Sequence, residues 1–451
     1  MAIGRSINTL VRSCTLASPF WSSGLRGTKI VATNHRGIRR PLASMKRLLM
    51  IAYHFPPLAG SSGVQRALRF ARYLPEFGWE PVVLTVHKRA YDQVREDQLR
   101  DIPTGIEVIR APAWDAARHF SLFGRYPGWL ARPDRWVSWW LGATAVGYPA
   151  IRRLQPAAIW STYPVATAHK IGTTLARRTG LPFIADFRDP MVQPGYPADP
   201  HTRRSFHHTE SGAISVARMC TFTTPSAART YRERYPDHAD RIRVLENGYD
   251  EETFVGIPIG EALNPGKLTV LHSGIVYPSE RDPTQLFAAL AALKSHAPAA
   301  YAQLRIRFRA AAHEGLLRQL AEKFAVAAAI EIVPLIAYRD ALAEMLAADG
   351  LLLLQAANCN EQIPAKFYEY LRAGKPILVL ADPAGDTAEA ARKAGLQSIA
   401  GLDDPKGIER VFQKFLADPK QGTLPTAETV RNSSRRGRTA QFAGLLDSIT
   451  Y

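Results

Sequence analysis

Polar residues that could bind an anionic ligand gather in one short segment, residues 360–381. The segment carries the carboxylates Glu361 and Glu369, and Gln362 and Lys366 lie between them. A lysine can neutralise a phosphate, and carboxylates and amides can hydrogen-bond to the hydroxyl groups of a sugar. Two glutamates eight residues apart are common by chance, so the spacing indicates a site only in a suitable structural setting. The alternative is that both are solvated residues on a helix surface.

The elements around this segment predict such a setting. The apolar run at 350–356 predicts a buried parallel strand, and residues 377–381 predict another. Pro364 suits the first helical position and Gly374 a left-handed stop, so we expect a short helix between the strands. In strand–helix–strand units ligands lie beyond the carboxyl ends of the strands, near helix N-termini that favour anions. We therefore expect the polar residues to face a crevice at this edge.

The same alternation of strands and helices extends along the whole chain. We expect strands at 46–53, 81–86, 106–111, 157–162, 182–187, 221–225, 242–247, 268–273, 304–309, 330–335, 350–356, 377–381 and 397–400. Turn-forming residues between 247 and 266 divide them into two sets. The pattern predicts an α/β fold with two doubly wound domains, residues 45–258 and 265–430, and a C-terminal helix within 431–451.

A glycine-rich loop follows the first expected strand. It contains Gly60, Ser61, Ser62 and Gly63, and glycines at this position let backbone N–H groups approach a ligand closely. The loop matches neither a Walker motif nor GxGxxG, so a P-loop nucleotidase is not indicated. A plain tight turn is the alternative.

Two further loops carry charged residues at strand ends. Asp186, Arg188 and Asp189 follow the fifth expected strand and project toward the same expected crevice. A local structural pair of Asp186 with Arg188 is the alternative. In the second half, Gly274 and Arg281 join a strand to a helix, and a guanidinium there could bind a diphosphate with two parallel hydrogen bonds.

The net charge of +17 is unevenly distributed. Residues 1–47 contain nine basic residues and no acidic residue, so more than half of the excess charge lies there. The segment has no sustained apolar run or helical period, and we expect residues 1–44 to form a disordered basic extension. It could imitate an organellar transit peptide, but we favour a dispensable extension that precedes a natural start at Met45.

Cysteine and histidine usage indicates neither disulfides nor a metal centre. Cys14, Cys220 and Cys359 form no paired or CxxC pattern, which favours a reducing compartment and argues against structural zinc. A small polar group contains His201, His207, His208 and Glu210. Because its spacing matches no zinc-ligand motif, we expect a surface group.

Aromatic residues and cations are concentrated between residues 114 and 140. The stretch contains Trp114, Phe120, Phe123, Trp129, Arg132, Arg135, Trp136, Trp139 and Trp140. Such a mixture suits a membrane interface, and the alternative is a helical hairpin that packs on the first domain. The charge-free part, 136–151, is too short to span a bilayer, so we expect no spanning helix.

The order of these motifs resembles that of retaining family-4 glycosyltransferases of the GT-B fold. The resemblance rests on the loops 60–63 and 274–281, the turn 247–250 and the segment 361–369, and it covers about residues 46–450. It implies two Rossmann-like domains that face a central cleft, with the nucleotide-sugar donor bound mainly by the C-terminal domain and the acceptor by the N-terminal domain. The pattern P-x-K-x-x-E-Y-x-x-A-G-K-P is similar to a subgroup associated with bacterial surface-polysaccharide assembly. The usual family signature E-G-F-G-x-P-x-x-E reads here E-Q-I-P-A-K-F-Y-E.

The resemblance also implies roles for single residues. Arg281 and Lys366 would neutralise the leaving diphosphate, Glu361 would contact the donor sugar, and Glu369 would accept hydrogen bonds from the ribose. The implied donor site further includes Gly60, Ser61, Ser62, Gly63, Gly274 and Gln362. The implied acceptor site consists of Asp186, Arg188 and Asp189. Fixed positive groups aimed at a departing phosphate lower the barrier to its release.

The implied reaction is the transfer of a sugar to a glycan or lipid-linked acceptor with retention of configuration. No protein nucleophile is evident, so the resemblance suggests front-face attack, in which the leaving phosphate takes the acceptor proton. No two aspartates are separated by a single residue, so the Asp-x-Asp metal motif of the other major glycosyltransferase fold is absent. We expect no metal and no cofactor beyond the nucleotide-sugar co-substrate, and a cytoplasmic enzyme with a peripheral contact to the inner face of the plasma membrane.

Two other classes of protein remain as alternatives. A nucleotide-sugar epimerase or another non-transferase enzyme of the same fold would share the layout, but an epimerase needs no acceptor. A nucleic-acid-binding protein would explain the basic charge. More than half of that charge lies in the extension, however, and the remainder carries no nucleic-acid-binding signature, so we expect no nucleic-acid partner.

Overall fold

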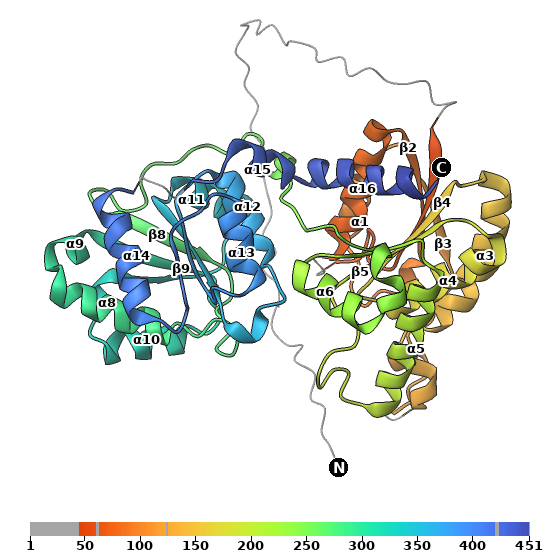
Figure 1. Cartoon of the computed structure of the whole chain (residues 1–451), viewed down its shortest axis with the longest axis horizontal. Coiled ribbons are helices and arrows are strands. Elements are labelled where there is room, and N and C mark those ends of the chain that lie inside the picture. Colours follow the sequence, from red (N-terminus) through yellow and green to blue (C-terminus); the bar gives the residue numbers. More distant parts are fainter. Residues whose placement is uncertain (1–44, 60–62, 123–124, 420–423, 451) are drawn as a thin grey trace, which may run out of the picture. The chain divides into compact units, whose positions relative to one another are not determined.

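The computed structural model describes residues 45–59, 63–122, 125–419 and 424–450. The expected disordered extension, residues 1–44, lies outside the described residues, as do the donor-site candidates Gly60, Ser61 and Ser62 and the aromatic residue Phe123. The described chain contains two parallel β-sheets, with helices on both faces of each (Figure 1). The sheet β1–β7 with its helices is called the N-terminal half below, and the sheet β8–β13 with its helices the C-terminal half.

The N-terminal sheet has the strand order β3-β2-β1-β4-β5-β6-β7. Its strands are β1 (Lys46–Ala52), β2 (Trp79–Val86), β3 (Glu107–Ala111), β4 (Ala158–Thr162), β5 (Phe183–Arg188), β6 (Met219–Phe222) and β7 (Ile242–Val244). Its helices are α1 (Gly63–Tyr73), α2 (Ala116–His119), α3 (Ser138–Leu154), α4 (Ala166–Thr179), α5 (Pro200–Val216) and α6 (Pro225–Arg234). The order reverses between β1 and β4, which makes their carboxyl ends a topological switch point.

The C-terminal sheet has the strand order β10-β9-β8-β11-β12-β13 and reverses between β8 and β11. Its strands are β8 (Leu268–Ser273), β9 (Leu304–Arg309), β10 (Ile330–Val333), β11 (Gly350–Gln355), β12 (Ile377–Ala381) and β13 (Ile399–Ala400). The helices after β7 are α7 (Glu251–Phe254), α8 (Thr284–His296), α9 (Pro298–Gln303), α10 (Glu314–Lys323), α11 (Tyr338–Ala347), α12 (Ala365–Ala373), α13 (Asp386–Lys393), α14 (Pro405–Ala417), α15 (Ala427–Asn432) and α16 (Arg435–Ile449).

Strand β11 shows why the sequence forms this layered structure. All six of its residues are buried, because helices cover both faces of the sheet. Leu352 and Leu354 belong to one hydrophobic core, which includes residues of α8 and α14. Leu351 and Leu353 belong to the opposite core, which includes residues of α11 and α12. The alternation of side chains along a strand therefore turns one leucine run into two cores.

The predicted α/β fold with two doubly wound parallel sheets is confirmed. Several predicted strands extend past the observed ones, and specific contacts explain two of these differences. The strand expected at 221–225 ends at Phe222, because Pro225 begins α6 and the Thr224 side chain caps that helix. The strand expected at 242–247 ends at Val244, and the carbonyl groups of the next two residues, Leu245 and Glu246, accept hydrogen bonds from a guanidinium, not from another strand.

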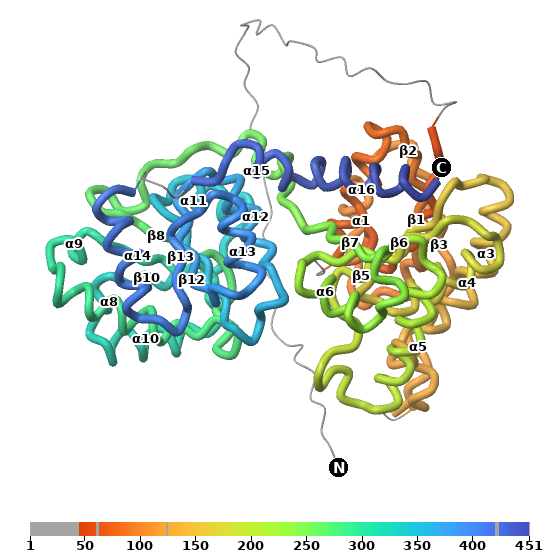
Figure 2. Tube along the Cα trace, in the orientation of Figure 1, coloured from red at the N-terminus to blue at the C-terminus, as the bar shows by residue number. Residues whose placement is uncertain are grey.

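The C-terminal helix α16 packs on the core of the N-terminal half. Phe442 and Leu446 are fully buried in that core, and the Phe442 ring lies 4.7 Å from Phe70 of α1. Figure 2 shows α16 running alongside α1. A second contact lies at the start of the helix, where the N–H of Tyr249 donates to Ser433 and its carbonyl accepts from Arg435. The two connections between the halves are therefore hydrogen-bonded to each other.

The aromatic stretch between residues 114 and 140 is divided between core and surface. Trp139 is fully buried in the N-terminal core, and Trp136 and Trp140 pack against the same core, as expected for a helix packed on this domain. Trp114 and Trp129 are 52% and 68% exposed. In the part of the chain that the structure describes, no helix is both long and apolar enough to cross a membrane.

Candidate functional site

The most distinctive polar contact of the C-terminal half lies at the start of α12. The Nζ atom of Lys366 is 3.2 Å from Nε2 of His272, which is fully buried near the end of β8. The Nδ1 atom of His272 is 2.9 Å from the carbonyl oxygen of Leu352, and this contact requires a proton on Nδ1. Nε2 therefore accepts from the lysine. Burial, together with nearby Arg281, lowers the pKa of Lys366 to about 7.

Gly274 makes room for this lysine. Its φ of 113° is a backbone conformation that favours glycine. A Cβ atom at this position would lie 3.1 Å from the Nζ atom of Lys366. The glycine thus suits the turn after β8 and leaves room for the ammonium group, which a Cβ atom would displace slightly.

Arg281 lies on the same loop after β8. Its Nη1 atom donates to the carbonyl oxygen of Ile275 at 3.0 Å, and its guanidinium stacks on the ring of Tyr277 at 5.2 Å. Its Nε atom is buried and has no hydrogen-bond partner among the described residues. Arg281 is close enough to Lys366 to lower the lysine pKa, so two cations share this edge of the sheet.

Glu369 lies one turn further along α12. Its Oε1 atom accepts a hydrogen bond of 2.7 Å from the hydroxyl of Tyr338, at the start of α11. Burial raises its pKa above the ordinary value, and Lys366 and Arg435 of α16 oppose that rise. The hydroxyl group of Tyr338 thus holds the Glu369 carboxylate near two cations, Lys366 and Arg435.

Glu361 and Gln362 lie on the loop between β11 and α12, and both are exposed. The side chain of Glu361 accepts from Thr230 of α6 at 3.3 Å, and its carbonyl oxygen accepts from Thr224 at 2.9 Å. The carbonyl oxygen of Gln362 accepts from Thr387. The structure therefore brings together Lys366, Gly274, Arg281 and Glu369, whereas Glu361 contacts α6.

Asp186 is not available to an acceptor in this structure. It is fully buried, and its two oxygens accept from both Nε and Nη2 of Arg66 at 2.8 and 2.9 Å. The hydroxyls of Thr162 and Thr221 complete its shell at 2.8 and 2.7 Å. The candidate acceptor role is corrected to a structural one, because all the lone pairs of the carboxylate face partners inside the protein. The structural partner is Arg66, not Arg188.

Arg188 and Asp189 lie at the carboxyl end of β5. Arg188 ends the strand, is partly buried, and donates from Nη1 to the carbonyl oxygen of Tyr163 at 3.3 Å. Asp189 is exposed, and its Oδ1 atom accepts from Thr223 at 3.3 Å. Gly63, the described member of the glycine-rich loop, is buried as the first residue of α1.

Sequence reasoning missed three polar residues of these edges, His272, Tyr338 and His54. His272 is the next-to-last residue of β8 and His54 lies two residues after β1, so each is a polar residue at the carboxyl end of an apolar strand. That position was a usable signal. Tyr338 carried none, because its contact with Glu369 joins two helices that are distant in the sequence.

The histidines near residue 201 do not converge with Glu210. His201, His207 and His208 are exposed or half-exposed, whereas Glu210 is fully buried and accepts from Tyr235 and Arg234. No group of three or more metal-ligating side chains occurs in residues 45–59, 63–122, 125–419 and 424–450.

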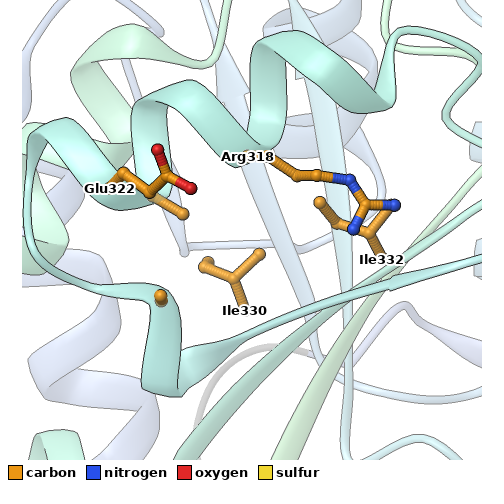
Figure 3. Close-up of a pocket in the computed structure, with 6 residues that line it drawn as sticks. Arg318, Glu322, Ile330 and Ile332 are labelled. Atoms are coloured by element: carbon orange, nitrogen blue, oxygen red, sulfur yellow. The ribbon is translucent and has the colours of Figure 1, made fainter.

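A surface hollow of about 260 Å³ lies at the edge of the C-terminal sheet, remote in strand order from the switch point between β8 and β11. It is lined by Arg318, Ala321, Glu322, Ala327, Ile330 and Ile332, and Figure 3 shows it between α10 and the edge strand β10. Because ligands of doubly wound folds bind beyond the carboxyl ends of the strands near a switch point, this hollow is not the candidate site.

Comparisons with known proteins give one family match and several matches of fold. Residues 62–248 match the Glycosyl transferase 4-like domain. Comparison with curated protein sequences gives no significant match.

Solved structures give matches across both halves. A glycosyltransferase from Rickettsia africae superposes with a TM-score of 0.61 at 13% identity, covering 90% of this chain and 98% of that one. Sucrose-phosphate synthase from Thermosynechococcus elongatus gives 0.57 at 14% identity, covering 89% and 98%. HepE from Anabaena, solved with UDP and glucose, gives 0.57 at 14% identity, covering 89% and 100%. Residues 62–248 thus carry a region similar to the Glycosyl transferase 4-like domain, and the described chain has the two-sheet GT-B fold of these enzymes.

Proposed function

We propose that this protein is a glycosyltransferase of the hexosyltransferase type that transfers a sugar from a nucleoside-diphosphate sugar to a hydroxyl acceptor. The observation that carries the proposal is the placement of Lys366 over Gly274, 3.2 Å from neutral His272. An ammonium group held by an imidazole, at a switch point and beside a second cation, suits a bound diphosphate. The solved structures of HepE with UDP, and with UDP-glucose, support a nucleotide-sugar donor.

The residues of this edge have separable roles in the proposed reaction. Lys366 and Arg281 would stabilise the charge that builds on the diphosphate as the glycosyl bond breaks. Glu369, held by Tyr338, would orient the ribose through hydrogen bonds. Glu361 would contact the donor sugar from the loop, and Gln362 and Gly274 would line the donor site.

The proposed stereochemical outcome is retention of configuration. Both glutamates of this edge, Glu361 and Glu369, have binding roles in the proposed reaction, and neither acts as a nucleophile. The leaving phosphate would therefore take the proton of the attacking hydroxyl on the same face of the sugar. The two cations would then do the work of a divalent ion, and neither a metal nor another cofactor would be needed. The product ratio of the two anomers, measured by NMR, tests this point directly.

The proposed acceptor is a glycan or a lipid-linked sugar of cell-surface polysaccharide synthesis, bound by the N-terminal half. Exposed aromatic residues of that half, Trp114 and Trp129 among them, would contact the inner face of the plasma membrane. Indole rings favour the headgroup region of a bilayer, and a peripheral enzyme would reach a lipid-linked acceptor there.

A thermal-shift screen of nucleotide sugars with and without EDTA tests the donor assignment, because a ligand that binds only the folded state raises its stability. The true donor should raise the melting temperature equally in both conditions. Glu369→Ala and Arg281→Ala should each abolish the shift. Glu314→Ala and Arg318→Ala are matched controls, because these residues form an exposed pair on α10 away from the candidate site. A normal shift in both site variants would refute the assignment.

Product analysis then separates a transferase from an epimerase of the same fold. A transferase needs an acceptor to consume the donor beyond slow hydrolysis, whereas an epimerase converts the donor alone. Conversion of the nucleotide sugar to its epimer without acceptor would exclude the proposed reaction.

A further inference from the structure

The switch point of the N-terminal sheet holds a second group of polar side chains. The strand order places β4 between β1 and β5, so the carboxyl ends of these three strands are neighbours. His54 follows β1, Tyr163 follows β4, and Arg188 ends β5. In doubly wound folds this edge is where ligands bind.

The backbone of Arg188 has an unusual conformation. Its φ is 64°, a conformation that non-glycine residues rarely adopt, and the register between β5 and β6 shifts between Asp186 and Arg188. The carbonyl oxygen of Arg188 is fixed by both the N–H and the hydroxyl of Thr223, at 2.8 Å each. Strained residues that the surrounding structure holds in place are concentrated at binding sites.

The charge of Arg188 is poorly compensated within the protein. Asp186 is committed to Arg66, and Asp189 is exposed and hydrogen-bonds to Thr223. Within the described residues Arg188 forms no ion pair, and its Nε atom is buried without a hydrogen-bond partner. A partly buried cation without a counter-ion is destabilising, because it has lost part of its hydration. A bound anion would offset this loss.

His54 is the second polar residue near Arg188 at this edge of the sheet. Its Nδ1 atom is buried and has no hydrogen-bond partner among the described residues. Burial lowers its pKa to about 4, and the charge of Arg188 contributes to the shift, so the two groups are close. At neutral pH the imidazole is uncharged and can either donate or accept a hydrogen bond.

We propose that Arg188 and His54 form a subsite for a phosphate group carried by the acceptor. The Nε and Nη groups of Arg188 would bind two phosphate oxygens, and His54 would donate to a third. A phosphate suits two donors on separate strands better than a carboxylate does, because it offers three oxygens. This inference rests on the proposed function, since it assigns the chemical class of the acceptor.

The test titrates phosphate compounds into the full-length protein saturated with UDP, which occupies the donor site. The probes are inorganic phosphate, glucose 6-phosphate and dodecyl phosphate, with glucose and dodecyl maltoside as uncharged controls. Isothermal titration should detect binding of the phosphates only. Arg188→Asn should weaken it by about tenfold to a hundredfold, the range expected for a charge-assisted hydrogen bond. Asparagine tolerates positive φ, so this variant keeps the backbone conformation.

His54→Phe should weaken binding less than Arg188→Asn, and the exposed control Arg318→Asn should not weaken it. Unchanged phosphate affinity in Arg188→Asn overturns the subsite, and so does equal binding of phosphorylated and uncharged probes. Binding of dodecyl phosphate but not glucose 6-phosphate would indicate a lipid-linked phosphate, and the reverse a soluble sugar phosphate.

The proposed function can fail separately. If UDP does not bind the wild-type protein, the donor is not a UDP-sugar, whereas phosphate binding that depends on Arg188 would still support the subsite. If UDP binds and phosphate does not, the donor assignment stands and the acceptor class is wrong.

Discussion

The ammonium group of Lys366 is hydrogen-bonded to Nε2 of His272, an imidazole that remains neutral because its own pKa is lowered well below the ordinary value by burial. The lysine is therefore held in place by a group that does not neutralise it. Its charge remains available to an anionic ligand at the carboxyl edge of the C-terminal sheet.

Binding of UDP should weaken as the pH rises above 7. The pKa of Lys366 is about 7 in the free protein, and a diphosphate favours the charged amine, so binding takes up a proton. Above pH 7 the affinity should fall by up to about tenfold per pH unit. Titration calorimetry at pH 6, 7, 8 and 9, in buffers of different ionisation enthalpy, measures the affinity and the proton uptake. Lys366→Arg stays charged and should show a flatter profile; affinity that rises with pH would contradict the prediction.

Gly274→Ala should weaken UDP binding by displacing the Lys366 ammonium group, whereas Gly266→Ala should not. Both glycines have positive φ, 113° and 76°, so both substitutions carry a backbone cost, and this cost is larger at Gly274, whose φ lies further from the left-handed region that alanine can adopt. Only at Gly274 does the added Cβ meet Lys366, and nothing lies within 4 Å of the corresponding atom at Gly266. Comparison of thermal unfolding with and without UDP separates stability from binding. If UDP raised the melting temperature of both variants equally, Gly274 would be needed only for the turn.

Arg66→Met should destabilise the N-terminal half by about 3–5 kcal/mol, because it leaves the carboxylate of Asp186 buried without its counter-ion. The midpoint of urea unfolding measures the loss. Arg153→Met removes the exposed pair with Glu107 and should have a much smaller effect, because solvent screens this pair. If the two variants unfold at the same urea concentration, the buried pair does not contribute as described.

Stability should fall as the pH is lowered from 6.5 toward 4, in part through His169. This buried imidazole is hydrogen-bonded to Ser161, and burial lowers its pKa to about 4, whereas the unfolded chain titrates near 6.5. Between these values the unfolded state binds more protons, so acid favours unfolding by up to about 1.4 kcal/mol per pH unit. Urea unfolding at pH 7, 6 and 5 should show a shallower dependence in His169→Gln. An equal slope in both proteins would contradict this.

The double variant Trp114→Ala and Trp129→Ala should bind anionic vesicles more weakly. These indoles are exposed, whereas Trp139 of the same stretch is buried and should not be altered. Co-sedimentation with phosphatidylglycerol vesicles measures the effect, and Leu335→Ala, at an 81% exposed residue of the C-terminal half, is the control. Undiminished sedimentation of the tryptophan variant would remove the proposed membrane contact.

The fold could be predicted from the sequence because both sheets are parallel and covered on both faces. Such strands are continuous apolar runs, and the predicted bounds of β8, β9 and β12 agree with the structure. The predicted end of β6 was wrong because Pro225 begins the next helix, and that of β7 because the carbonyl group of Leu245 accepts a hydrogen bond from Arg66, distant in the sequence.

The candidate site could be predicted less completely. The position of Lys366 and Glu369 on one short helix after β11 could be predicted because a strand, a loop and a proline lead into that helix. Asp186 was assigned to the acceptor site because it lies at the carboxyl end of a strand, whereas its carboxylate pairs with Arg66, 120 positions earlier in the chain. Contacts of this kind depend on strand order, which hydrophobic periodicity does not encode.

The paired connections between the halves have a consequence for limited proteolysis. Tyr249 in one connection is hydrogen-bonded to Ser433 and Arg435 in the other, and Gly248 has no room for a side chain because a Cβ atom would lie 2.5 Å from the carbonyl oxygen of Ser433. A protease that cuts only one of these crossings would leave the fragments tethered by the intact one and by α16 on its core. The nicked protein should migrate as two bands under denaturing conditions and elute as a single species from a sizing column.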